Sequence, residues 1–132
     1  MLHSLIVRDY MTKTLVSFTP DQDVIKAAQI LATRRIGGAP VVSDIGNLVG
    51  ILSDTDCIKA MIKHQFHPGW RGLVSEFMSS DVETVDLDDS ILTVSERFLK
   101  QRYRRYPVME DNRLVGQISR LDVLRALESM DH

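Results

Sequence analysis

The chain has 132 residues, of which 44% are hydrophobic and 26% charged, values typical of a folded globular protein rather than a disordered one. Its formal charge of −2 leaves no excess of positive charge to bind a nucleic-acid backbone, so DNA and RNA are not expected partners. With one cysteine, Cys57, no internal disulfide or cysteine metal cluster can form, and the lack of a signal peptide or long apolar run predicts a cytoplasmic protein without membrane insertion.

The first half of the chain predicts a short strand, a helix, two strands and a second helix, in that order. Acidic residues at 21–23 suit the positive end of a helix dipole, and the apolar residues after them recur at helical spacing until Gly37-Gly38 end the helix. The apolar runs at residues 40–42 and 48–52 are separated by a turn and predict two strands. Apolar residues at helical spacing from Ile58 onward predict the second helix.

Residues 7–61 are repeated at residues 74–127, so the second half predicts the same elements again. The best-aligned segments are Val7–Met11 with Val74–Met78, Ala39–Val42 with Tyr106–Met109, and Leu48–Asp56 with Leu114–Asp122. A chain built twice from one unit predicts copies that pack face to face and create two related clefts. Each copy alone is near the size at which a hydrophobic core becomes marginal, so the copies should depend on each other.

The two strand-to-helix junctions are the best candidate sites, because each combines a helix start with a serine and an aspartate. A helix N-terminus presents free backbone N–H groups and partial positive charge, which favour an anion such as phosphate. Ser53 and Ser119 add a hydroxyl donor at this point. Asp56 and Asp122, three residues later, can accept hydrogen bonds from two neighbouring hydroxyls of a sugar. Together these groups predict a site for a ribose and its phosphate.

The same Ser-x-x-Asp pattern has a purely structural interpretation. It is also a helix capping box, in which the serine and the acid satisfy backbone donors of the helix start. An aspartate folded back onto its own helix end cannot reach a ribose, so the two interpretations partly exclude each other. Finding the pattern in both copies does not decide between them, because a duplication copies caps as well as sites.

The order of elements, the tandem repeat and the Gly-x-x-Ser-x-x-Asp junctions resemble a tandem pair of CBS domains, often called a Bateman module. The openings Met11-Thr12 and Met78-Ser79 fit the same pattern, and the resemblance extends from about Val7 to Leu127. It implies a mixed α/β fold (α+β) of two pseudo-symmetric β-α-β-β-α units packed sheet to sheet. Residues 1–66 would then form the first unit with the start of the linker, and residues 67–132 the second.

The resemblance also implies a function. Clefts in this family often bind AMP, ADP, ATP or S-adenosylmethionine, so the chain is expected to be a regulatory sensor rather than an enzyme. An adenosine nucleotide would be its regulatory ligand rather than a required cofactor. The chain would form a homodimer and signal to a separate partner protein through a ligand-dependent change in the pose of its two units. The alternative is a ligand-free module for dimerisation and protein interaction.

Carried over by position, the resemblance assigns a part of the ligand to each candidate residue. The ribose would contact Asp56 and Asp122, and the phosphate would contact Ser53 and Ser119. The adenine would lie against apolar residues of one copy or the other, near Leu15, Ala39, Pro40 and Val41 or near Val82, Tyr106, Pro107 and Val108.

The two copies differ in charge around their junctions. The first copy has Asp54 beside its serine, and this extra anion opposes a phosphate, whereas the second copy has Arg120 at the equivalent position. The second copy also has Arg104 and Arg105 where the first has Gly37-Gly38. An arginine pairs with phosphate oxygens through two parallel hydrogen bonds, so these arginines are candidate phosphate ligands.

The arginines also have a structural explanation. Arg102, Arg104 and Arg105 follow a predicted helix, and cations are favoured at a solvated helix C-terminus in any case. With both explanations open, the charges still favour one good nucleotide site around Ser119 and Asp122, and a weaker or empty one in the first copy.

The segment between the copies offers weaker candidates. Its His64 and His67 are spaced His-x-x-His, but two imidazoles make an incomplete metal site, so no metal is expected. Phe66 and Trp70 either anchor a partner or pack against the chain's own core. Cys57 is expected to be a small buried residue, although a helix N-terminus can lower a thiol pKa.

Overall fold

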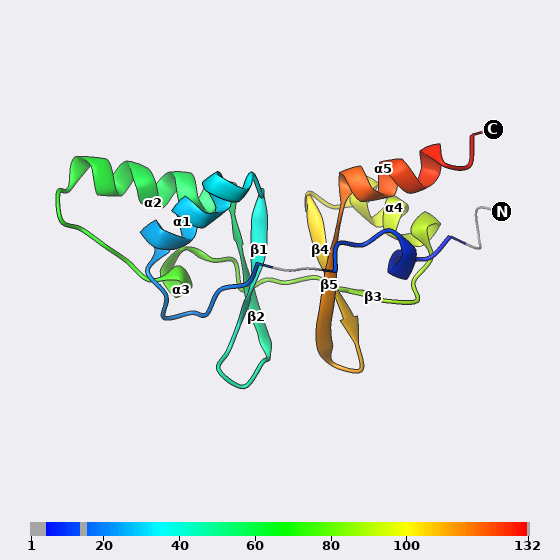
Figure 1. Cartoon of the computed structure of the whole chain (residues 1–132), viewed down its shortest axis with the longest axis horizontal. Coiled ribbons are helices and arrows are strands. Elements are labelled where there is room, and N and C mark those ends of the chain that lie inside the picture. Colours follow the sequence, from blue (N-terminus) through cyan, green and yellow to red (C-terminus); the bar gives the residue numbers. More distant parts are fainter. Residues whose placement is uncertain (1–4, 14–15, 132) are drawn as a thin grey trace. The chain divides into compact units, whose positions relative to one another are not determined.

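The chain folds into two α/β units that do not follow the order of the repeats. The structure is a computed structural model, and it describes residues 5–13 and 16–131. Val16–Val82 forms the central unit, and the described residues of Met1–Leu15 and Glu83–His132 form the terminal unit. Figure 1 shows two small sheets, each with its own helices beside it, which confirms the expected mixed α/β class.

The central unit is built on a two-stranded antiparallel sheet. Its elements are α1 (Val24–Arg34), β1 (Gly38–Val42), β2 (Leu48–Ser53), α2 (Asp54–Phe66) and the short α3 (Val74–Phe77). The expected first strand is reduced to a single parallel bridge between Phe18 and Val41. Buried apolar side chains from all five elements form the core, among them Ile25, Leu52 and Val74.

The terminal unit has the complete predicted order of short strand, helix, strand, strand and helix. Its elements are η2 (Val7–Asp9), β3 (Val85–Asp86), α4 (Ile91–Lys100), β4 (Arg105–Glu110), β5 (Arg113–Ser119) and α5 (Arg120–Glu128). β3 runs parallel to β4, and β4 is antiparallel to β5. Tyr106, Ile91 and Ile118 are completely buried in its core, together with Val7 from the start of the chain.

The start of helix α1 agrees with the prediction from the sequence, and its end does not. The helix begins as predicted from its acids, because the Asp23 side chain accepts a hydrogen bond from the backbone N–H of Ile25 at 2.9 Å. The prediction that Gly37-Gly38 end the helix is wrong, since α1 stops at Arg34 and Gly38 already belongs to β1. Arg35 adopts the left-handed conformation, with φ 56°, and its N–H donates to carbonyls of the last turn. A residue in this conformation satisfies the last carbonyls as a glycine would.

The opening segment of each repeat pairs with the hairpin of the other repeat. Thr12 and Gln117 exchange backbone hydrogen bonds of 2.9 and 3.1 Å in the terminal unit. In the central unit, Ser79 and Ile51 do the same at 2.9 Å each. The two compact units therefore are not the same segments as the two sequence repeats. Each unit needs a segment from both repeats, which gives the expected dependence between the halves a structural cause.

The glycine of each junction motif allows this exchange. A Cβ on Gly50 would lie 2.6 Å from the sulfur of Met78 and 2.9 Å from the carbonyl oxygen of Ser79. A Cβ on Gly116 would lie 2.7 Å from the sulfur of Met11, with the next carbonyl oxygen at 2.8 Å. The glycine and the opening methionine of the opposite repeat are therefore matched partners in packing.

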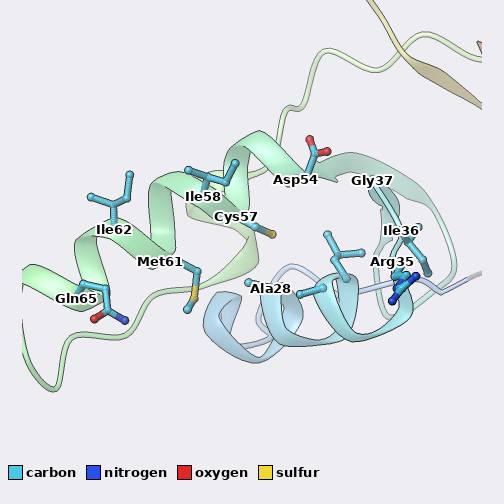
Figure 2. Close-up of a pocket in the computed structure, with 12 residues that line it drawn as sticks. Ala28, Arg35, Ile36, Gly37, Asp54, Cys57, Ile58, Met61, Ile62 and Gln65 are labelled. Carbon is cyan, nitrogen blue, oxygen red and sulfur yellow. The ribbon is translucent and has the colours of Figure 1, made fainter.

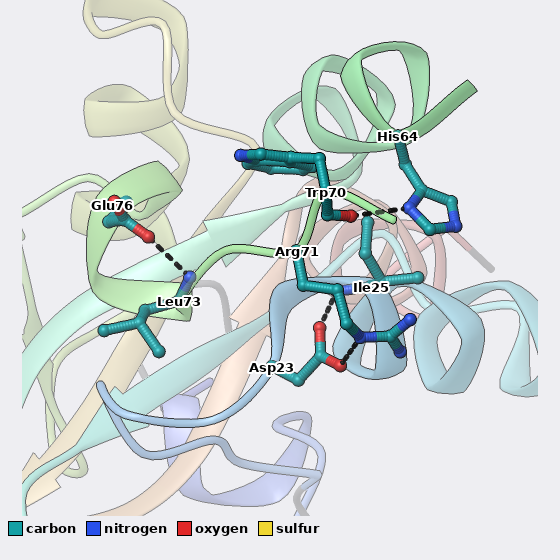
Figure 3. A network of polar contacts seen from close by, with 7 residues as sticks. All are labelled: Asp23, Ile25, His64, Trp70, Arg71, Leu73 and Glu76. Atoms are coloured by element: carbon teal, nitrogen blue, oxygen red, sulfur yellow. Dashed lines mark hydrogen bonds and ion pairs between the residues drawn. The ribbon is translucent and has the colours of Figure 1, made fainter. Parts of the chain in front are cut away.

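The segment that joins the repeats is fastened to the central unit. Figure 3 shows His64 Nδ1 donating to the carbonyl oxygen of Trp70 at 2.8 Å, and Arg71 paired with Asp23 at 2.6 Å. The Trp70 ring meets Phe77 edge-on, with ring centroids 5.7 Å apart. Trp70 thus packs against its own unit, the second of the two roles considered for it.

Candidate functional site

Both strand-to-helix junctions are closed by the capping box that the sequence allowed as an alternative. At α2, the backbone N–H of Ser53 donates to Asp56 Oδ2 at 2.9 Å, and the N–H of Asp56 donates to Ser53 Oγ at 3.2 Å. At α5, Ser119 and Asp122 form the same two hydrogen bonds at 2.9 and 3.2 Å. Each cap occupies one carboxylate oxygen, Oδ2, and leaves Oδ1 to other partners.

The two Oδ1 atoms have different surroundings. Arg125 donates from Nη2 to Asp122 Oδ1 at 2.5 Å, and the Asp122 side chain is only 7% exposed. Asp56 is half-buried, and within the described part of the chain no hydrogen bond reaches its Oδ1. The two aspartates that the sequence treats as equivalent are therefore not equally accessible.

The structure brings the predicted phosphate ligands of the second copy together at the start of α5. Arg105 lies opposite Ser119 in the pairing of β4 with β5. The backbone N–H of Arg120 donates to the carbonyl oxygen of Arg104, and its Nε donates to that of Tyr103, both at 3.2 Å. The backbone thus places three arginines next to a serine at a helix N-terminus, and positive charge near a helix start favours an anion.

The central unit repeats this backbone arrangement with other side chains. Gly38 lies opposite Ser53, and the N–H of Asp54 donates to the carbonyl oxygen of Gly37 at 2.8 Å. A carboxylate and two glycines therefore stand where the terminal unit has three arginines. The electrostatic contrast expected from the sequence is present at equivalent positions of the two folds.

The residues predicted to line an adenine pocket lie mainly in the cores. Six of the eight are buried, namely Ala39, Pro40, Val41, Tyr106, Pro107 and Val108. Val82 is half-buried, and Leu15 lies outside the described residues. The Tyr106 hydroxyl donates to Gln101 at 2.7 Å, and its ring centroid is 4.6 Å from that of Phe98. The six buried side chains pack in the cores and stabilise their units. An adenine ring next to these strands would therefore contact the backbone or half-buried side chains such as Val82.

A hollow of about 610 Å³ between α1 and α2 was not expected from the sequence. Figure 2 shows Cys57 and Met61 pointing from α2 toward α1, with Asp54 at one end. Two small residues on α1, Ala28 and Ala32, line the hollow. Their spacing of four residues on one helix face was the sequence pattern that could have indicated it. Burial raises the pKa of the Cys57 thiol to about 11, so the thiol stays protonated and is a poor nucleophile.

The histidines of the joining segment lie at the C-terminal end of α2, whereas the junction with Ser53 lies at its N-terminal end. The Nδ1 of His64 is engaged with Trp70, and His67 is exposed just beyond the end of α2. Among residues 5–13 and 16–131, no group of three or more His, Cys, Asp or Glu side chains is placed to hold a metal ion. In that same part of the chain, no helix is long and apolar enough to cross a bilayer.

Comparison with known proteins identifies the repeat. The model of the CBS domain matches residues 7–63 and again residues 74–129. The chain belongs to the CBS-domain family. Its two matched domains place it with the CBS pairs, and the resemblance drawn from the junction motifs is confirmed.

Solved CBS pairs have the same fold. CBSX2 from Arabidopsis thaliana, in complex with AMP, is 25% identical, with a TM-score of 0.84 over 98% of this chain and 100% of that chain. The CBS pair of protein MJ0100, in complex with 5′-methylthioadenosine and S-adenosyl-L-methionine, is 26% identical, with a TM-score of 0.81 over 95% of this chain and 97% of that chain.

Curated relatives include both short and long proteins. The CBS domain-containing protein YhcV of Bacillus subtilis is 31% identical over 86% of this chain and 79% of its own length. The CBS pair spans only 14% to 43% of the length of several other curated relatives. CBS pairs thus occur both as most of a protein and as a small part of one.

Proposed function

We propose that this CBS pair is a regulatory sensor of adenosine nucleotides that signals to a separate partner protein. The observation that carries the proposal is the cationic junction of the terminal unit. There Arg105 pairs with Ser119 across the strands, and Arg120 follows Ser119 and bonds through its backbone to Arg104 at the N-terminus of α5. The similarity to CBSX2, a CBS pair in complex with AMP, supports an adenosine nucleotide as the ligand whose phosphate would bind at this junction.

The aspartates supply the ribose part of this proposal. A carboxylate has about four lone-pair positions, so the capping bond to Oδ2 leaves capacity at Oδ1 for a hydroxyl donor. In the terminal unit, Asp122 and Ser119 would hold ribose and phosphate. In the central unit, Asp56 offers the same carboxylate, but Asp54 repels a phosphate beside Ser53. The central junction is therefore the weaker nucleotide site.

The signal would be a ligand-dependent change in the pose of the two units. A ligand shifts such an equilibrium only when it binds one pose more tightly than the other. The partner protein would then recognise the favoured pose. The nucleotide acts as a regulatory ligand in this scheme, and the buried, protonated Cys57 gives no support to covalent catalysis.

A homodimer is part of the proposal, and exposed apolar side chains on the helices support it. Ile58 and Ile62 of α2 are 58% and 54% exposed, and Leu121 and Leu124 of α5 are 60% exposed each. Figure 2 shows Ile58 and Ile62 among the residues that line the hollow beside α2. Exposed apolar side chains grouped on a helix are a common basis for association between protein chains.

The same exposed side chains favour a second function, a ligand-free module for dimerisation and protein interaction. Both capping boxes are formed by the chain's own groups, which gives each aspartate a structural role besides any ligand contact. In this alternative, Asp56 and Asp122 serve only as caps, and nucleotides leave the stability of the protein unchanged.

Thermal unfolding with AMP, ADP, ATP and S-adenosylmethionine separates the two functions. The protein is first unfolded and refolded to remove any bound nucleotide. Ligand at about a hundred times its Kd adds about 2.7 kcal/mol to the free energy of unfolding. For a protein of this size, that raises the Tm by about 10 °C.

Matched variants assign such a shift to a junction. Asp122→Asn keeps an oxygen for the cap but loses one carboxylate acceptor, and Asp56→Asn does the same in the central unit. We expect Asp122→Asn to lose most of the nucleotide-induced rise in Tm and Asp56→Asn to lose less. A wild-type Tm that none of the four ligands changes would reject the sensor in favour of the ligand-free module.

A further inference from the structure

The carboxylate of Asp122 makes two polar contacts. Its Oδ2 accepts the capping-box hydrogen bond from the Ser119 backbone N–H at 2.9 Å, and its Oδ1 pairs with Arg125 Nη2 at 2.5 Å. The Asp122 side chain is 7% exposed, whereas that of Arg125 is 59% exposed. A ribose hydroxyl that approaches this nearly buried carboxylate therefore competes with one of these two contacts.

Arg125 is the contact that opens at the lowest cost. Breaking the bonds to Ser119 would leave backbone donors of α5 without partners and would destabilise the helix start. The Arg125 side chain, in contrast, lies at the surface one turn further along the helix, and water replaces its partner when it swings away. Rehydration of the exposed guanidinium offsets part of the cost of leaving the nearly buried carboxylate with its capping hydrogen bond alone.

The central unit has no such cover. Lys59 occupies the position equivalent to Arg125, and it is exposed. Within residues 5–13 and 16–131, Lys59 forms no ion pair with Asp56. A lysine is a point charge on a flexible stem, whereas the planar guanidinium of an arginine matches a carboxylate. At this position, one turn beyond the aspartate, the two units therefore differ by an arginine against a lysine.

We infer that Arg125 is a gate on Asp122, and that ligand binding to the terminal unit requires it to leave the carboxylate. This inference rests on the proposed function, because it concerns access to the same ribose site. It assigns the terminal unit two opposing features. Its arginines beside Ser119 attract the phosphate, and its Arg125 lowers the affinity for the sugar.

Isothermal titration with AMP, ADP and ATP tests the gate in an Asp56→Asn background, where the central site is weakened. Arg125→Ala is expected to raise the affinity of the terminal site by about two- to five-fold, the range of an ion pair with an exposed member. Arg125→Lys should give a smaller rise, because lysine restores part of the pair. The matched control is Lys59→Ala in the Asp122→Asn background, which should leave the affinity of the central site unchanged.

The outcomes distinguish the gate from the proposed function. A purely structural role for Arg125 would lower the Tm of the ligand-free variant without raising nucleotide affinity. Equal or weaker binding by Arg125→Ala would overturn the gate while leaving nucleotide sensing intact. Binding by wild type but by neither Asp56→Asn protein would overturn it as well, because the ligand would then belong to the central unit. If wild type binds none of the three nucleotides, the proposed function fails and the gate with it.

Discussion

Replacing Gly116 by alanine tests the packing that holds the terminal unit together. The new methyl group would lie 2.7 Å from the sulfur of Met11 and 2.8 Å from the carbonyl oxygen of Thr12. The methionine can adopt another rotamer, but the carbonyl is part of the backbone. Thr12 is fixed by hydrogen bonds of 2.9 and 3.1 Å to Gln117, so relief of the clash requires this bridge to lengthen or break.

The expected cost follows from this geometry. Overpacking of a well-packed site costs about 1–3 kcal/mol, and the loss of backbone hydrogen bonds places Gly116→Ala toward the upper part of that range. For a protein of this length, the Tm should fall by about 5 to 12 °C. Calorimetry or circular dichroism measures the fall directly. Met11→Ala added to Gly116→Ala should recover only the part due to the sulfur, because the clash with the Thr12 carbonyl remains.

A Tm within about 1 °C of wild type would refute this reasoning, because it would mean that the opening segment does not lie against Gly116. Gly50→Ala is the matched variant in the central unit, where the methyl group would lie 2.9 Å from the carbonyl oxygen of Ser79. A similar fall in both variants is expected, since both glycines face an opening segment at the same separation.

Three further outcomes follow from the structure. A fragment of residues 16–82 should unfold cooperatively on its own, because it contains one whole compact unit. Residues 1–66, the first unit expected from the resemblance, should not, because they lack the segment with Ser79; circular dichroism melts of both fragments check this. Burial raises the Cys57 pKa to about 11, so the folded state keeps a proton that the unfolded state loses. Stability should therefore fall more between about pH 9 and 11 in wild type than in Cys57→Ala, where the raised pKa of buried Tyr106 still contributes. Ile62 is 54% exposed, so Ile62→Glu should convert a dimer to monomers in analytical ultracentrifugation with little change in circular dichroism. An unchanged sedimentation coefficient would argue against dimerisation through α2.

Local signals in the sequence predicted most of the secondary structure. Helical spacing, acids at the helix start and the Ser-x-x-Asp pattern act within a few residues, and the structure contains α1, α2 and both capping boxes as these signals indicate. The end of α1 was missed because the left-handed residue is Arg35, and an arginine rarely adopts that conformation. Gly37, two residues after Arg35, wrongly indicated a later end of the helix.

Features that depend on tertiary packing were not predictable in the same way. The pairing of Thr12 with Gln117 joins residues from opposite ends of the chain, and a repeat pattern does not show which copy an opening segment joins. Tyr106 is buried because α4 packs against β4, the strand that contains it. The sequence alone therefore did not show whether Tyr106 is a core residue or an adenine contact. The ion pair between Arg125 and Asp122 required the rotamers of both side chains.

The most direct test of the central claim is an NMR titration of ligand-free, refolded protein with AMP, following the backbone amides of the two junctions. The account predicts that the amides of Ser119, Arg120 and Asp122 shift progressively and saturate. Those of Ser53 and Asp56 should shift less or only at higher AMP concentration. If saturating AMP leaves the amides of both junctions unchanged, no adenosine nucleotide of this kind binds there, and the chain is a CBS pair that works without this ligand.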